Sequence, residues 1–205
     1  MKAQYFLFIL LGTIFWRCGH SNLYNKQITL LDSTKIVLQV KLNELKKAES
    51  NISHLPFGKF EAYTVFLNSN LKDTINKFQA NALQLFMSSG KTIKQFNESK
   101  PALIKQTETS ILQIQKLSGD IKENSVAQNV IDNYFNNEKA EADKLINVIE
   151  QNIKALNLSL INFKNSTPRT EELIRQINNG QLPAIVTDSI SEENGDFVFF
   201  PKCNF

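Results

Sequence analysis

The chain has 205 residues, 42% of them hydrophobic and 21% charged, which excludes an intrinsically disordered chain and an integral membrane protein and leaves room for one domain with a substantial core. The formal net charge is +3, but Lys2 and Arg17 belong to the N-terminal segment, and without them 21 basic residues stand against 20 acidic ones. This balance gives no electrostatic reason to expect a nucleic-acid partner, and we predict none.

The first residues combine a positive charge, a short apolar run and a cysteine. Lys2 precedes the apolar run at 5–16, and Cys18 follows it. A run of twelve residues is too short for a transmembrane helix, which needs about 20, and fits the apolar region of a secretory signal. We predict a signal peptide at 1–17 and a polar tether at 18–25.

This N-terminal pattern resembles the signal of bacterial membrane lipoproteins. In that family the cysteine becomes the lipid-modified first residue of the mature chain. The resemblance therefore implies lipidation of Cys18 and a cell-envelope protein that is anchored in a membrane and faces the periplasm or the cell exterior. The family usually has a small residue before the cysteine, where this chain has Arg17, and an uncleaved signal is the alternative. A disulfide between Cys18 and Cys203, the two cysteines of the sequence, is the alternative to lipidation.

Apolar residues at alternating spacings of three and four predict long amphipathic helices over 26–180. The first helix carries one apolar stripe and ends at a break over 51–58, because Pro56 disfavours helix at and just before its own position. The stripe consists of Ile28, Leu31, Leu38, Leu42, Leu45 and Ile52.

Two further helices are expected before residue 123. The second covers 60–96 and is loosened where Gly90 follows two serines. The third starts at 97–101, where Ser99 can serve as the N-cap and Pro101 lies in the first turn, and it ends at about Lys122.

The strongest helical period belongs to a fourth helix over 130–163. A short fifth helix is expected to begin at 167–168, where a threonine precedes a proline, and to end at Asn179–Gly180, since glycine is typical of the position after a helix. Only 7 glycines and 5 prolines occur, which favours long helices over a turn-rich β-fold. The predicted fold class is all-α: an elongated, mostly antiparallel bundle of four to five helices with a short extended or hairpin C-terminal tail.

The tail is expected over 181–205. Residues 184–190 and 197–200 are β-prone and flank the turn pair Asn194-Gly195, so a hairpin and an extended segment both fit the sequence. Residues 197–200 (FVFF) and Phe205 form an apolar segment outside the helices, which would either cover one end of the bundle or dock on another protein or a membrane. We favour the intramolecular role.

The sequence offers few groups for catalysis or metal binding. His20 lies in the tether and His54 in the first break, and neither has another ligand at helical spacing. Residues 89–92 (SGKT) match the end of a phosphate-binding loop but lack its upstream glycine. Glu138 and Glu141 have the spacing of di-iron bundle carboxylates without the partner histidines, and we interpret them as solvated. We therefore predict no catalytic, cofactor-binding or metal-binding residue and no cofactor.

These observations together predict a membrane-anchored, non-enzymatic helical module for interaction or scaffolding. Its anchor is Cys18, and a protein partner would bind along the faces of the bundle. Two alternatives are a binding protein that holds a small apolar ligand between helices, against the stripe over 60–96, and a membrane-active helical bundle. The last normally needs a strongly apolar hairpin, and the sequence shows none after residue 18.

Overall fold

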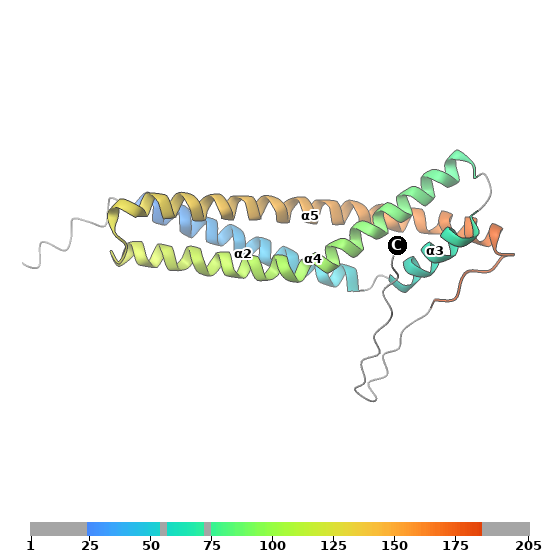
Figure 1. Ribbon diagram of the computed structural model, residues 1–205, viewed down its shortest axis with the longest axis horizontal. Helices are drawn as coiled ribbons and strands as arrows, with labels where there is room; N and C mark the ends of the chain where they lie inside the picture. Colours follow the sequence, from blue (N-terminus) through green and yellow to red (C-terminus); the bar gives the residue numbers. More distant parts are fainter. Residues whose placement is uncertain (1–23, 54–56, 72–74, 186–205) are drawn as a thin grey trace, which may run out of the picture.

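The computed structural model describes residues 24–53, 57–71 and 75–185. Over these residues the chain is all-α, as predicted, and forms an elongated body in which α2, α4 and α5 lie side by side and α3 lies at one end (Figure 1). The four helices are α2 (Asn25–Ser53), α3 (Phe57–Asn70), α4 (Lys77–Lys122) and α5 (Gln128–Ile177). The predicted signal segment with Cys18 and the chain after residue 185 lie outside these residues, so the predictions made for them stay predictions.

Polar pairs between the long helices show in which directions these helices run relative to one another. The pairs, in order along α2, are Gln27–Asp132, Asp32–Lys122, Lys41–Glu150 and Lys46–Glu108. Partner numbers on α5 rise along α2, whereas those on α4 fall. Hence α2 runs parallel to α5 and antiparallel to α4, and the connection between α4 and α5 lies near the start of α2.

The stripe predicted for the first helix is confirmed as the core seam of α2. Leu31, Leu38 and Leu45 are fully buried at intervals of seven residues, the spacing of a coiled-coil seam. Ile114 of α4 and Ile149 of α5 are fully buried in the same core cluster. Because burying such a side chain contributes roughly 1.5–3 kcal/mol, this seam holds the long part of the bundle together.

The single helix predicted over 60–96 is wrong, because α3 ends at Asn70 and a separate helix, α4, begins at Lys77. A capping box starts α4: the side chain of Asn76 accepts a hydrogen bond from the Gln79 backbone N–H (2.9 Å), and the Gln79 side chain accepts one from the Asn76 N–H (3.1 Å). The apolar period continues on both sides of this break, which is why the period alone does not show it.

The helix starts predicted at 97–101 and at 167–168 are also wrong, because α4 runs through Pro101 and α5 runs through Pro168. A proline inside a helix costs about 3 kcal/mol relative to alanine, since one backbone hydrogen bond is lost. Both prolines are exposed, and so are Asn97 and Lys164, the residues four positions earlier with which a proline cannot form the helical hydrogen bond. Burial on the opposite faces outweighs the cost, and α4 changes direction along its length (Figure 1).

The end of α5 agrees with the predicted stop at Asn179–Gly180. Both residues have a positive φ, 51° for Asn179 and 86° for Gly180, and the second is a conformation that glycine adopts readily. The Gly180 N–H donates to the Arg175 carbonyl at 2.8 Å, which closes the last turn. The chain therefore leaves α5 along a fixed path into the segment that ends at Ile185.

Gly90 does not loosen α4, which continues through it. It is buried where the ring of Phe60 in α3 packs against α4. A Cβ atom on Gly90 would lie 2.1 Å from Cε2 of Phe60, so the ring occupies the space that any side chain would need. The glycine thus permits the close approach of α3 to α4.

We expect Gly90→Ala to lower the free energy of unfolding by roughly 1–3 kcal/mol, because the methyl group would displace the Phe60 ring. Gly119→Ala is the matched control: Gly119 is also inside α4, and a Cβ there meets nothing within 4 Å. It should raise the free energy of unfolding by up to about 1 kcal/mol. Urea unfolding followed by far-UV circular dichroism measures both, and equal effects of the two substitutions would contradict the packing described.

Candidate functional site

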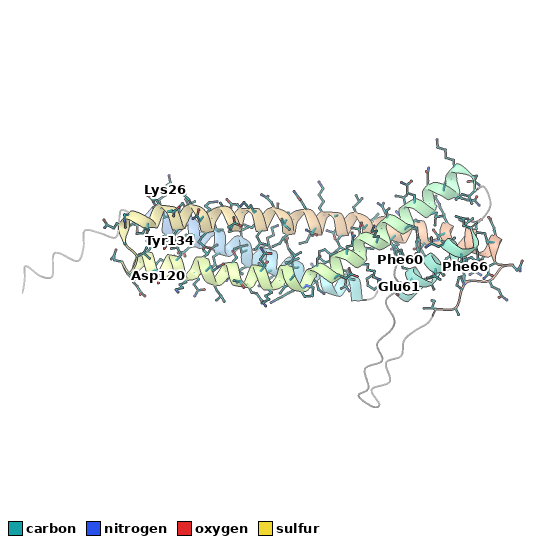
Figure 2. The ribbon with its side chains drawn as sticks, viewed as in Figure 1. Lys26, Phe60, Glu61, Phe66, Asp120 and Tyr134 are labelled. Carbon is teal, nitrogen blue, oxygen red and sulfur yellow. The ribbon has the colours of Figure 1, made fainter. Side chains whose placement is uncertain are left out.

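An aromatic cluster fastens α3 to the bundle. It consists of Phe60 and Tyr63 of α3, Phe86 of α4 and Phe163 of α5, all buried. The ring centroids of Phe86 and Phe163 lie 5.0 Å apart, and those of Phe60 and Phe86 lie 5.6 Å apart, separations at which aromatic pairs attract. The cluster defines one end of the molecule, opposite the end that carries Lys26, Asp120 and Tyr134 (Figure 2).

A polar group borders the aromatic cluster. The hydroxyl of Tyr63 donates a hydrogen bond to Oε1 of Glu171 at 3.1 Å, and the ammonium of Lys59 forms an ion pair with the same carboxylate. The Lys59 ammonium also lies 5.7 Å from the centroid of the Tyr63 ring, within the range of a cation–π contact. These three side chains join α3 to the last part of α5.

The chemistry of this polar group follows from the pKa of Tyr63. Burial raises that pKa to about 12, and the hydrogen bond to Glu171 and the charge of its carboxylate act in the same direction. Tyr63 is therefore a protonated hydrogen-bond donor at neutral pH, not a base or nucleophile. The arrangement suits a structural clasp between two helices.

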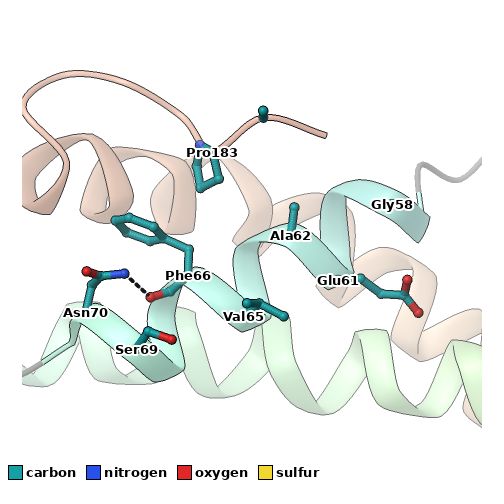
Figure 3. A pocket seen from close by; sticks show the side chains of 9 residues that line it. Gly58, Glu61, Ala62, Val65, Phe66, Ser69, Asn70 and Pro183 are labelled. Carbon is teal, nitrogen blue, oxygen red and sulfur yellow. Dashed lines mark hydrogen bonds between the residues drawn. The ribbon is translucent and has the colours of Figure 1, made fainter. Parts of the chain in front are cut away.

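A groove of about 530 Å³ lies on the outer face of α3. Phe66 and Pro183 lie at one side of it, and Glu61 points outward near the other (Figure 3). Val65 is 66% exposed, and Glu61 forms an ion pair with Lys94 of α4 at 2.7 Å. The lining consists of Gly58, Glu61, Ala62, Val65, Phe66, Ser69 and Asn70 of α3, with Pro183 and Ala184. We call this the α3 groove; its mixed apolar and polar lining suits the binding of a chain segment or ligand.

A second groove, of about 460 Å³, lies between α4 and α5 in the long part of the bundle. Its lining includes both Glu138 and Glu141, the carboxylates singled out in the sequence. Glu141 is exposed and forms an ion pair with Lys144 at 2.7 Å, in agreement with the interpretation that it is solvated. Lys105, Gln106 and Thr109 of α4 also line this groove, so side chains of both helices form its walls.

The structure does not gather the other residues considered in the sequence into one site. Residues 89–92 lie inside α4, so the SGKT match is a stretch of helix and not a phosphate-binding loop. Cys18, His20, His54 and Cys203 lie outside the residues that the structure describes. Within 24–53, 57–71 and 75–185, no group of three or more His, Cys, Asp or Glu side chains is placed to hold a metal ion. None of α2–α5 has a stretch both long and apolar enough to cross a bilayer.

The clasp of Lys59, Tyr63 and Glu171 was not predicted from the sequence. Lys59 and Tyr63 are four residues apart and so share a helix face, a spacing that could have linked them. Glu171 lies 108 residues beyond Tyr63, and no local pattern joins it to them.

We expect Tyr63 to titrate near pH 12 in the folded protein, because its pKa is raised from 10.0 to about 12. A raised pKa means that the folded state holds the phenol proton more tightly than the unfolded state, so this contribution to stability is complete below pH 10 and is lost as the pH rises to 12. Tyr63→Phe should remove the late step in an ultraviolet titration of tyrosine and flatten the fall in stability over this range.

Tyr134→Phe is the control for that titration, because it removes a tyrosine that is 50% exposed and outside the clasp. The late step should persist in this variant. A late step that survives Tyr63→Phe would contradict the assignment.

Comparisons of this chain with protein-family models, with curated protein sequences and with solved structures give no match.

Proposed function

We propose that this protein is a cell-envelope lipoprotein, anchored through a lipid on Cys18, that acts as a non-enzymatic helical module for interaction or scaffolding. The observation that carries the proposal is the distance along the bundle between the start of α2 and α3. The sequence supports the anchor through the apolar run at 5–16 and the cysteine that follows.

The start of α2 and the whole of α3 belong to opposite ends of the bundle. Gln27, near the start of α2, donates to Asp132 near the start of α5 at 3.3 Å. Tyr63 of α3 donates instead to Glu171, close to the end of α5. At 1.5 Å per residue, the stretch of α5 between Asp132 and Glu171 is about 60 Å long. This length separates the two ends.

A lipid on Cys18 would therefore keep the start of α2 close to a membrane. Cys18 lies seven residues before Asn25, the first residue of α2, and a chain spans at most about 3.6 Å per residue. The anchor would thus stay within about 25 Å of the start of α2, beside the connection between α4 and α5. The α3 groove lies tens of ångströms from this anchored end, so a bundle that stands upright on the membrane would act as a spacer with a binding surface at its tip.

The faces of the long helices supply surface for a protein partner. On α2, Ile36 is 58% exposed and Val40, one turn later, is 49% exposed. On α5, Leu158 and Ile161 are 59% and 58% exposed. Single exposed apolar residues are ordinary, but pairs on neighbouring turns form patches that suit contact with another protein. This supports a partner along the bundle faces as part of the proposal.

The anchor is tested by metabolic labelling with a palmitate analogue in a bacterium that modifies lipoproteins. The wild-type chain should incorporate the label and separate with membranes, whereas Cys18→Ser should lose the label completely. Cys203→Ser is the matched control and should stay labelled. An unlabelled wild-type chain, or label that persists in Cys18→Ser, would overturn the anchor.

The interaction role is tested by a photo-crosslinking residue at Ile36 in living cells. We expect one discrete adduct with an envelope protein identified by mass spectrometry, lost when Val40 is changed to Ser, because both side chains belong to one patch. The control position is Gln115, an exposed polar residue of α4. Equal adducts at Ile36 and Gln115, or an adduct indifferent to Val40→Ser, would argue against a specific partner on this face.

A further inference from the structure

The α3 groove is partly built by the chain that follows α5. Pro183 and Ala184 line it together with Phe66 of α3 (Figure 3). Two hydrogen bonds hold the chain just before them against the end of α5. The side chain of Arg175 donates to the Gly180 carbonyl at 3.2 Å, and the side chain of Asn178 donates to the Gln181 carbonyl at 3.1 Å. The described chain therefore ends inside the groove, not at a distance from it.

Apolar surface remains uncovered at this place. Val65 is 66% exposed inside the groove, and Ile185, the next residue after its lining, is 42% exposed. Phe66 is only partly buried. Covering these side chains would remove apolar area from water, which is favourable in proportion to the area covered.

The sequence that follows Ile185 contains a segment suited to cover them. Residues 197–200 read FVFF, and Asn194-Gly195, a pair typical of tight chain reversal, stands just before them. The twelve residues from 185 to 197 reach up to about 40 Å when extended, so a return to the groove needs no stretching. The entropy lost on closing such a loop grows only with the logarithm of its length.

We propose that the α3 groove is the docking site of the chain's own segment Phe197–Phe200. A segment tethered at the rim of the groove has an effective concentration in the millimolar range, which favours it over a free ligand or a second copy of the chain. A partner that uses this groove would have to displace the segment first. The proposal does not rest on the lipid anchor or on a partner along the bundle faces.

The test uses Cys203, which lies three residues after Phe200. In the full chain with Cys18→Ser, Val65→Cys places a second thiol in the groove, and mild oxidation should give an intramolecular disulfide identified by peptide mapping. Leu112→Cys is the matched control, because Leu112 has the same 66% exposure as Val65 but lies on α4 away from the groove. We expect the disulfide at position 65 to form at least about tenfold faster than at position 112.

A second pair of variants separates docking from chance encounter. Changing Phe197, Phe199 and Phe200 to Ser should bring the rate at position 65 down to that of the control. Ser69→Cys places the thiol at another exposed position of the groove. This second position is needed because a disulfide forms only when the two Cα atoms are about 4.4–6.8 Å apart.

The proposal is overturned if neither Val65→Cys nor Ser69→Cys exceeds the control, if the serine substitutions leave the rate unchanged, or if the product is a disulfide-linked dimer. The last result would assign the groove to a second copy of the chain. All substituted positions of the groove and the control are exposed, so far-UV circular dichroism should confirm an unchanged helical content in every variant.

Discussion

The shape of the α3 end depends on one steric constraint, the absence of a side chain at Gly90. The ring of Phe60 rests on the backbone of α4 at this point, and from there it reaches the rings of Phe86 and Phe163. With a longer separation between α3 and α4, these centroid distances of 5.6 and 6.1 Å would not hold. The clasp between Tyr63 and Glu171 depends on the same approach. A residue with no side-chain atoms thus determines where α3 and its groove lie.

The long part of the bundle is stabilised differently. There, regular burial of one helix face keeps the helices continuous where a backbone hydrogen bond is lost. Pro101 and Pro168 each remove a backbone hydrogen bond from inside a helix, yet neither helix ends there. Fully buried residues such as Ile114 and Leu156 lie within four turns of these prolines and hold the helices together from the opposite side. In a bundle of this length, the packing of a helix face decides its continuity more than the propensity of single residues.

This contrast explains how much of the molecule could be predicted from its sequence. The all-α class and the seam of Leu31, Leu38 and Leu45 follow from periodicity, because a helix can bury only one face. The end of α5 followed from its glycine, but other helix boundaries did not. Pro101 and Pro168 have the pattern of helix starts, yet burial carries both helices through them, and the capping pair Asn76 and Gln79 lies inside a continuous apolar period. The candidate site was the hardest part to predict from the sequence, because its contacts join residues that are far apart along the chain.

The parallel arrangement of α2 and α5 affects how the chain folds during its synthesis. Gln27 and Asp132 are 105 residues apart, and Asp32 and Lys122 are 90 apart, so α2 is synthesised long before the helices that cover it. At about 5–20 residues per second, translation leaves its leucine face without partners for roughly 5–20 seconds. By contrast, α4 and α5 follow each other in the sequence and can pair as soon as both have been synthesised. Of the described helices, α2 is the first to be synthesised, and its leucine face stays without its helical partners until α4 and α5 follow.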